Sequence, residues 1–441
     1  MGRVLRLTDL SLAVVGGVVL ALGIPSCADD AGLTNVIDST DAGAVQDVAD
    51  TAPAAGEAAD LAASEATMDL VGTDGERAND VPAIVDNCGP DKARCSVPGC
   101  PVNLCIAPSH VPANFGTWAR DPRLTDVTLP IFWMGNYLDA SSGEAGEAGR
   151  SHRPSWRGPN INALAYEVVD GIGFIRVPQG PGEPEIGIWV FKSLRLGRAD
   201  DQSRGAPYIS VWGQAALLAS AGDLTLEDGA DALTAGLGHE LSGGGTQDGP
   251  AKGCGPGQAG AMGGGGGAFS DGGMAASEGA LGGMAASCAS YAKLRVLRGG
   301  SGGGYGAVGR DNRDTIASTG GAGGGAVQLT ALGVLTLNAS ILADGSSGRR
   351  FNEIGGPGGA GSGGGIFLEA PLIRVGRRVV VSAAGGAGTP IFAYDPLRVI
   401  GLSGAGGQGW VVIKTMEGGL PPSLRPYPTR GAFSFSYDLG Q

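Results

Sequence analysis

The sequence has only three histidines among 441 residues, and this scarcity limits the catalytic chemistry it can support. They stand at His110, His152 and His239, and residue 243 is glycine, so the His-Glu-x-x-His pattern of zinc proteases is missing. No basic patch is present, which argues against a nucleic-acid partner. The glycine-aspartate nonapeptide of calcium-binding β-rolls is absent, and the glycines lack the strict three-residue period of collagen. We therefore predict no metal, cofactor or catalytic residue.

Negative charge is plentiful but confined to one segment. The formal net charge is −13, and residues 28–83 contribute 1 − 13 = −12 of it, from one arginine and thirteen acids. Residues 27–86 contain no aromatic residue and show no lasting hydrophobic period, so they cannot bury enough apolar surface to offset the entropy of folding. We predict a disordered acidic linker that holds the remaining chain away from a membrane.

Residues 1–26 have the features of an export signal. Arg3 and Arg6 precede an apolar run over residues 10–24, and the segment ends Ile-Pro-Ser before Cys27. This ending resembles the lipobox of bacterial lipoproteins, in which the cysteine is acylated and becomes the mature N-terminus, although Pro25 departs from the pattern. We predict lipidation at Cys27 and a lipid anchor in the cell envelope, at the outer membrane or cell surface. Ordinary secretion after cleavage at Ala28 and an uncleaved anchor are the alternatives.

Six cysteines remain once Cys27 is assigned to lipid, and an even number suits disulfides in an oxidising compartment. Four of them lie in a small segment over residues 87–106, and two lie in a glycine-rich tract. Four thiolates could instead bind zinc, but structural zinc pairs are usually spaced more closely. We predict disulfides and leave the pairing of the first four open. The candidates are Cys88, Cys95, Cys100, Cys105, Cys254 and Cys288.

Residues 107–235 form a section of short β-like runs and contain five of the six tryptophans. Val, Ile, Phe and Trp gather in these runs, and Gly, Pro and Asp clusters separate them. Residues 215–221 read AALLASA, and we predict a buried strand there because glycines bracket a short run. The runs lie at 127–133, 173–177, 186–196 and 208–212.

Residues 236–441 form a glycine-rich section with an internal repeat. Residues 241–325 contain 30 glycines, which form either mobile loops or backbones that pack directly against one another. Residues 325–331, 364–370 and 409–415 then share a pattern of glycine, any residue, β-branched, any residue, aliphatic, polar and small. Short strands on such a repeat predict an all-β fold with a parallel β-helix or solenoid-like stack. The runner-up has packed polyglycine-type helices, or disordered glycine tracts, beside a β-sandwich.

The chain resembles a group of glycine-rich exported proteins abundant in myxobacteria over residues 186–415. The resemblance rests on residues 188–196, residues 215–230 and the glycine-strand units that begin at 323 and 363. It implies a cell-surface setting and a β architecture. It implies no reaction and transfers no catalytic residue.

Two glycine motifs imitate catalytic or cofactor sites. Residues 304–309 match the dinucleotide pattern G-x-G-x-x-G, and residues 299–303 match the G-x-S-x-G nucleophile elbow. Both motifs require a helix directly after the glycines, and no helical period follows either of them. We interpret the second match as a flexible Gly-Ser loop. Arg374, Arg377 and Arg378 form a basic run that suits a solvated sheet edge or a charged carbohydrate.

These features predict a non-enzymatic lipoprotein of the cell surface with a structural, adhesive or matrix-contact role. Its expected partners are the membrane, through the lipid, and surface polysaccharide or other envelope components. The alternative is a polysaccharide-active β-helix enzyme, a lyase or a glycosidase, which needs paired carboxylates or a carboxylate with arginine. The repeats offer Glu369, Arg374 and Asp344 for such a site.

Overall fold

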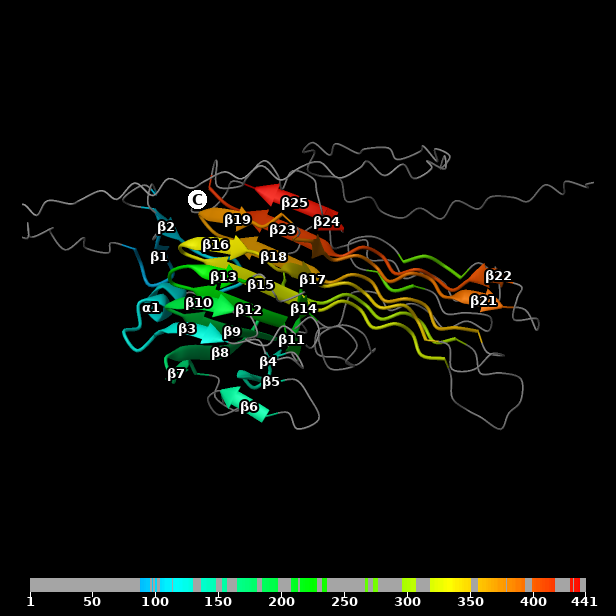
Figure 1. Ribbon diagram of the computed structural model, residues 1–441, viewed down its shortest axis with the longest axis horizontal. Helices are drawn as coiled ribbons and strands as arrows, with labels where there is room; N and C mark the ends of the chain where they lie inside the picture. The colour runs from blue at the N-terminus through cyan, green and yellow to red at the C-terminus, as the bar shows by residue number, and fades with distance from the viewer. Residues whose placement is uncertain are drawn as a thin grey trace, which may run out of the picture. The chain divides into compact units, whose positions relative to one another are not determined.

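Leucine recurs at every second position of strand-forming segments such as 194–196, 224–226 and 335–337. The computed structural model arranges the strand-forming segments as an all-β fold (Figure 1). This confirms the predicted β-rich architecture of the described residues. The signal segment, Cys27 and the acidic linker lie outside the described residues. The structure describes residues 88–129, 136–147, 153–156, 165–180, 185–196, 208–227, 232–235, 266–276, 296–306, 318–349, 356–392, 399–416 and 429–436, with short gaps inside some of these ranges.

Three large sheets make up the described strands, and we call them sheets 1, 2 and 3. Sheet 1 has five strands in the spatial order β19-β16-β13-β10-β3. All its neighbouring strands are parallel. Its strands are β3 (Asp126–Leu129), β10 (Ser193–Leu196), β13 (Leu224–Leu226), β16 (Val334–Leu337) and β19 (Leu372–Val375).

Sheet 2 has eight strands in the order β24-β20-β17-β14-β11-β4-β5-β6. It is parallel from β24 to β4 and ends in the antiparallel strands β5 and β6. Its strands are β4 (Asn136–Asp139), β5 (Glu144–Glu147), β6 (Arg153–Trp156), β11 (Tyr208–Trp212), β14 (Ala232–Ala235), β17 (Ser340–Leu342), β20 (Val381–Ser382) and β24 (Thr429–Arg430).

Sheet 3 has eight strands in the order β25-β23-β18-β15-β12-β9-β8-β7. It is parallel from β25 to β9, and β8 and β7 close it with antiparallel pairing. Its strands are β7 (Glu167–Val169), β8 (Ile172–Pro178), β9 (Glu185–Phe191), β12 (Ala215–Ser220), β15 (Ala326–Ala331), β18 (Gly365–Glu369), β23 (Trp410–Lys414) and β25 (Ala432–Ser436).

The remaining described elements are small. Strands β1 (Ala93–Arg94) and β2 (Cys105–Ile106) pair with each other, as do β21 (Pro390–Phe392) and β22 (Val399–Leu402). The helix α1 (Phe115–Ala119) follows β2.

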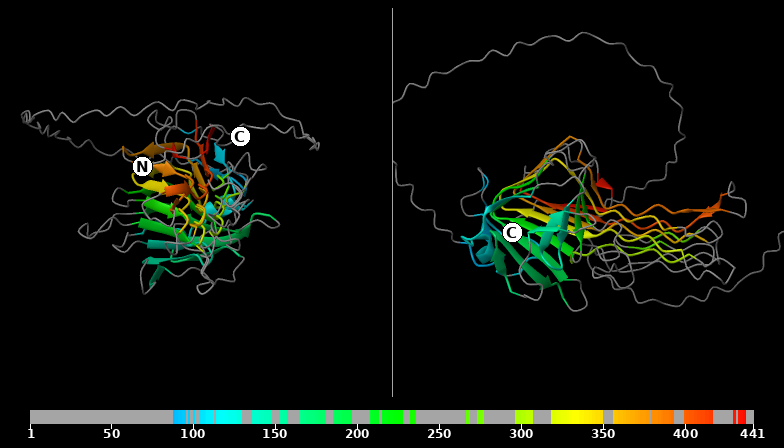
Figure 2. Two further views of the ribbon diagram at one scale, coloured as in Figure 1. Left: turned by 90° about the vertical axis from the view of Figure 1, so that its right-hand side faces the viewer. Right: turned by 60° about the horizontal axis from the view of Figure 1, so that its bottom comes forward.

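Consecutive strands visit the three sheets in rotation. From β9 to β20, each strand lies in the sheet that follows its predecessor's, in the order 3, 1, 2. Each strand from β9 to β17 therefore pairs with the strand three places later in the chain, and the colours in Figure 2 climb the stack in sequence order. The antiparallel pairs of β5, β6, β7 and β8 form the N-terminal end of sheets 2 and 3.

The repeat predicted from the sequence sets the register of sheet 3. Its first strand segments are β15, β18 and β23, in which Ala326 pairs with Gly365 and Gly365 with Trp410. The next segment of the first two repeats gives β16 and β19, where Val334 pairs with Leu372. Equivalent positions of the repeat therefore lie side by side, because parallel in-register pairing stacks identical positions. The run at residues 215–221 also gives a strand, β12, whose six residues are all buried.

The main core lies between the inward faces of the sheets. Leucines of sheet 1 meet alternate residues of sheet 3 in this core, including Leu218, Leu329 and Leu368. The outer face of sheet 3 is also apolar and belongs to a second core. Ile106 and the Phe115 and Trp118 side chains of α1 cover that face, so residues 88–124 form what we call the covering segment. Sheet 3 is thus buried on both faces, which explains the unbroken burial of its central strands.

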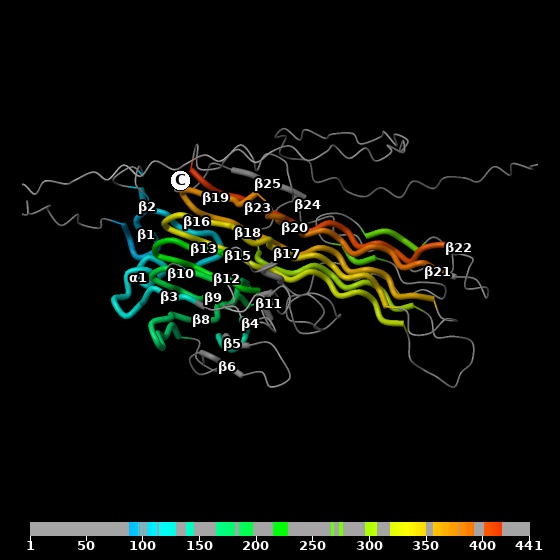
Figure 3. Tube along the Cα trace, in the orientation of Figure 1, coloured from blue at the N-terminus to red at the C-terminus, as the bar shows by residue number. Residues whose placement is uncertain are grey.

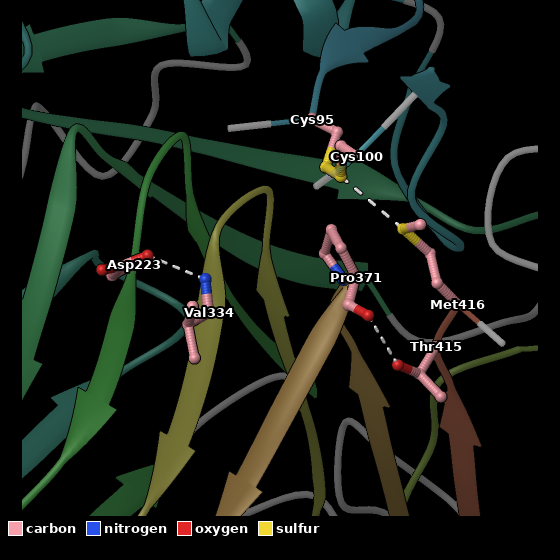
Figure 4. Close-up of a disulfide and its surroundings, with 7 residues drawn as sticks. All are labelled: Cys95, Cys100, Asp223, Val334, Pro371, Thr415 and Met416. Carbon is pink, nitrogen blue, oxygen red and sulfur yellow. Dashed lines mark hydrogen bonds between the residues drawn. A yellow bond between two sulfur atoms is a disulfide. The ribbon is translucent and has the colours of Figure 1, made fainter. Parts of the chain in front are cut away.

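Turns between strands are fixed by side-chain bonds at one end of the stack (Figure 4). The Asp223 carboxylate accepts a hydrogen bond of 2.7 Å from the Val334 amide, and the Thr415 hydroxyl donates one of 3.0 Å to the Pro371 carbonyl. The sulfur of Cys100, which belongs to the Cys95–Cys100 disulfide, lies 3.6 Å from the sulfur of Met416. These contacts tie neighbouring turns together and join the covering segment to the end of β23.

The described glycine-rich segments form a bundle of extended chains (Figure 3). The amides of Gly358, Gly361 and Gly364 donate to the carbonyls of Arg349, Ser346 and Ala343, so the bonds recur at every third residue. The same three-residue step joins residues 300–306 to residues 318–324. A step of three residues is typical of polyproline II and polyglycine helices. We call these chains, residues 299–306, 318–325, 343–349, 357–365, 383–389 and 403–409, the glycine bundle.

Missing side chains allow the bundle to form. A Cβ atom at Gly361 would overlap the carbonyl oxygen of Ala322, and one at Gly364 would overlap that of Gly325. Neighbouring backbones therefore approach one another at distances that only glycine permits. The bundle satisfies its backbone groups laterally, as buried amides and carbonyls require.

The bundle corrects one expectation from the sequence. Residues 299–303 are not a flexible Gly-Ser loop, because the Gly300 amide donates 2.6 Å to the Gly324 carbonyl and Ser301 is buried. The packed polyglycine alternative describes these residues better. The sequence did not favour packed polyglycine chains, because glycine has no side chain and so shows no pattern that predicts lateral packing.

Candidate functional site

A polar patch interrupts the apolar outer face of sheet 3. Side chains alternate between the two faces of a strand, so pairing in register creates rows across the sheet. One row runs from Leu217 to Gln328, Phe367 and Val412. The next row runs from Ala219 to Thr330, Glu369 and Lys414. The patch consists of Gln328 and Thr330 on β15, Glu369 on β18 and Lys414 on β23.

Glu369 is the centre of the patch, and its side chain is 2% exposed. The Ser109 amide of the covering segment donates to both carboxylate oxygens, at 3.2 Å to Oε1 and 2.9 Å to Oε2. Oε2 also accepts from Gln328 Nε2 at 3.0 Å and from the Thr330 hydroxyl at 3.3 Å. The buried carboxylate is therefore satisfied by neutral donors from the protein itself, as a buried charge requires.

Gln328 connects this carboxylate to the covering segment. Its Nε2 donates 2.8 Å to the Ser109 carbonyl, and its Oε1 lies 2.7 Å from His110 Nδ1. The His110 ring packs edge-on against Phe367, with centroids 4.9 Å apart. His110 has a φ of 58°, a backbone conformation uncommon for a residue with a side chain. This turn brings both Ser109 and His110 onto the patch.

Lys414 closes the patch on the side of β23. Its Nζ donates 2.6 Å to the Ser109 hydroxyl, lies 3.6 Å from Glu369 Oε1 and sits 5.2 Å from the centre of the Phe367 ring. The lysine side chain is 31% exposed, so it reaches solvent while its ammonium faces the buried acid. The cation balances the charge of Glu369 at the rim of the patch.

The arrangement attaches the covering segment to sheet 3. The Glu369 carboxylate contacts the Ser109 amide of the covering segment and three side chains on neighbouring strands, those of Gln328, Thr330 and Lys414. Such a network fixes a turn in place, because leaving any one of its buried groups without a partner costs free energy. Its chemistry is that of a structural joint between Ser109, His110 and the three strands.

The four cysteines of residues 87–106 form two disulfides, as predicted. Cys88 pairs with Cys105, and Cys95 pairs with Cys100. The pairing left open by the sequence is thus one wide bridge enclosing a narrow one. Cys27, Cys254 and Cys288 lie outside the described residues.

No protein-family model, curated protein or solved structure matches this chain.

Within the described residues, no group of three or more His, Cys, Asp or Glu side chains is placed to hold a metal ion. None of the described helices reaches the length and hydropathy of a bilayer-spanning segment. The His239-Glu240 pair falls outside the described part of the chain. The serine of the nucleophile-elbow match, Ser301, donates 2.6 Å to the Ala268 carbonyl inside the glycine bundle. No helix follows it within residues 301–306, so the elbow geometry is absent there.

The three residues proposed for the enzyme alternative occupy separate settings. Asp344 follows β17 and accepts 2.5 Å from the Ser382 hydroxyl and 2.7 Å from the Ala384 amide. Arg374 is exposed on β19 of sheet 1, whereas Glu369 is buried against the covering segment. Sequence reasoning treated Glu369 as a potential acid and missed its partners. Thr330, Glu369 and Lys414 share the polar position of the repeat, so their adjacency was available, whereas Ser109 and His110 lie more than 200 positions away from them.

Proposed function

We propose that this protein is a lipid-anchored component of the bacterial cell envelope with a structural or adhesive, non-enzymatic role. The observation that carries the proposal is that the buried carboxylate of Glu369 is bound by other groups of the protein. Glu369, the strongest candidate for an acid, is held by Ser109, Gln328, Thr330 and Lys414 in a joint that fixes the covering segment. Its lone pairs are thereby occupied by structural hydrogen bonds.

The disulfides support an exported setting. Cys88–Cys105 and Cys95–Cys100 lie in a segment that packs on sheet 3, and such bonds persist in oxidising compartments. The lipobox-like sequence that ends at Cys27 supports a membrane anchor, and the acidic linker supplies distance from the membrane. The resemblance to glycine-rich exported proteins of myxobacteria agrees with this setting and stays a prediction.

We include in the proposal that the strand stack is a short three-sided parallel β-helix. Such an architecture suits a structural or adhesive role. Support comes from the rotation of β9 to β20 through three sheets and from their parallel, in-register pairing. Stacked coils cover one another's apolar faces, so this construction gives a stiff body. In the glycine bundle, neighbouring chains are held by backbone hydrogen bonds instead of side-chain packing.

The proposal is tested with purified full-length protein on a panel of acidic and neutral polysaccharides. Release of reducing ends reports glycosidase activity, and absorbance of unsaturated products reports lyase activity. We expect no turnover of any substrate by the wild-type protein or by Glu369→Gln. Turnover of any polysaccharide by the wild-type protein would overturn the non-enzymatic role and would restore the β-helix enzyme.

A further inference from the structure

The outer face of sheet 1 carries a row of hydroxyl and guanidinium side chains. Register places Thr128 beside Arg195, then Thr225, Thr336 and Arg374, one from each of the five strands. Their neighbours along each strand, such as Leu194, Leu335 and Ile373, belong to the main core. The row therefore faces away from the core, and we call its five residues the threonine-arginine row.

The row is accessible and evenly spaced. Thr128, Arg195 and Arg374 are exposed, and Thr225 and Thr336 are partly exposed between them. Strands lie about 4.8 Å apart, so the row spans about 19 Å and its two arginines stand about 14 Å apart. Such a line of polar groups across parallel strands matches an extended polymer better than a compact small molecule.

The charge of this face is concentrated at β19. Near β3 and β10, Lys192 pairs with Asp126 at 2.9 Å, and Arg195 pairs with Glu227. The hydrogen bond from Lys192 lowers the pKa of Asp126, with a second contribution from Ser193, so that carboxylate remains charged beside its lysine. Arg374 lies on β19, and Arg377 lies two residues after Val375, the last residue of that strand. Both are exposed cations without an ion-pair partner among the described residues.

We propose that the threonine-arginine row, with Arg377, binds a linear carboxylated polysaccharide laid across the strands of sheet 1. This inference rests on the proposed envelope function and names a ligand for it. Guanidinium groups bind carboxylates in a planar two-bond geometry, and two unpaired ones stand at the β19 end. Threonine hydroxyls both donate and accept, so they match the hydroxyls of sugar rings between the acids.

Other polyanions fit the row less well. Single-stranded nucleic acid is held by aromatic side chains that stack on the bases, and the row has none. A membrane surface is entered by exposed apolar side chains, whereas the five residues of the row are polar. An acidic polysaccharide requires only charges and hydroxyls, which are the groups that the row supplies.

The test measures binding of polygalacturonate to the full-length protein, with neutral dextran as the uncharged comparison. We expect wild-type protein to bind polygalacturonate and not dextran. The double variant Arg374→Gln/Arg377→Gln removes the two unpaired cations, and we expect it to weaken binding at least tenfold. Thr225→Val/Thr336→Val keeps the shape and strand preference of the row but removes two hydroxyls, and we expect a loss of about threefold or more.

The matched control is Arg123→Gln/Arg349→Gln, which changes the net charge equally at two exposed arginines outside sheet 1. Binding that falls equally in this control and in Arg374→Gln/Arg377→Gln would overturn the site, because general charge would then explain it. Failure of wild-type protein to bind polygalacturonate would also overturn the site. Neither result involves turnover of a polysaccharide. Failure of the binding site is therefore distinguished from failure of the proposed function, which the turnover assay detects.

Discussion

At the scale of single residues, two kinds of position carry this structure: glycines that must lack a side chain and polar residues that must keep one. Gly361 donates its amide proton to the Ser346 carbonyl, and an added Cβ atom there would overlap the Ala322 carbonyl oxygen. Glu369 gathers donors from the covering segment and from two neighbouring strands. The first kind is intolerant of an added methyl group, and the second is intolerant of a lost charge.

Gly361→Ala should destabilise the protein. The new methyl would overlap the carbonyl oxygen of Ala322, so a neighbouring chain of the bundle must move, at a cost of about 1–3 kcal/mol in the free energy of unfolding. The control is Gly376→Ala, whose added Cβ would meet the movable Asn338 side chain at 3.2 Å and should change stability by less than about 1 kcal/mol. Urea unfolding measures both, and equal stability of the two variants would contradict the close packing of the bundle.

Glu369→Gln should weaken the joint under the covering segment. The amide of glutamine presents a donor to the Gln328 and Ser109 donors, so we expect a loss of about 2–4 kcal/mol in the free energy of unfolding. Glu227→Gln is the matched control, because its partner Arg195 is 62% exposed and an exposed pair contributes about 0–1 kcal/mol. Thermal and chemical unfolding compare them, and a neutral Glu369→Gln would show that the joint is not structural.

At the scale of elements, the covering segment stands out because it is short and yet seals the outer face of sheet 3. The helix α1 contributes the buried Phe115 and Trp118, and Trp118 stacks on Tyr166 with centroids 5.0 Å apart. Tyr166 is partly buried there, and this burial raises the pKa of its hydroxyl. A five-residue helix has little stability of its own, so disulfides and tertiary contacts must hold it.

The two disulfides should contribute unequally. Cys88–Cys105 closes a sequence separation of 17 and Cys95–Cys100 one of 5, so loop entropy assigns about 3 kcal/mol to the first and about 2 kcal/mol to the second. We expect Cys88→Ser/Cys105→Ser to lower stability more than Cys95→Ser/Cys100→Ser, and to increase hydrogen exchange in α1 and in residues 104–111. The reverse order of stability would contradict this account of the segment.

The sequence predicted the strands better than it predicted what covers them. The sequence marked β12, β15, β18 and β23 as strands, and the aligned repeat gave the register of β15, β18 and β23. The helix α1 was not predicted, because its sequence FGTWA has no period long enough to read and its stability comes from contacts with sheet 3. Glu369 was recognised as a titratable residue, but its partners Ser109 and His110 approach it only in the folded chain.

At the scale of the whole molecule, all the described residues belong to one compact unit, Asp80–Gln441. The compact unit combines strands with an ordinary core and a bundle that packs backbone on backbone. The sequence places nearly all of the net negative charge in the acidic linker, outside the strands and the bundle. Charge therefore carries information about a ligand only locally, at Arg374 and Arg377.

The central claim is that this unit is exported and anchored through Cys27. Intact mass of the protein extracted from membranes of the native cell, without reduction, tests it most directly. We predict a chain that begins at Cys27, carries two or three acyl groups and has the Cys88–Cys105 and Cys95–Cys100 disulfides oxidised. An unacylated chain that begins at Asp29, or one that retains residues 1–26, would contradict the account.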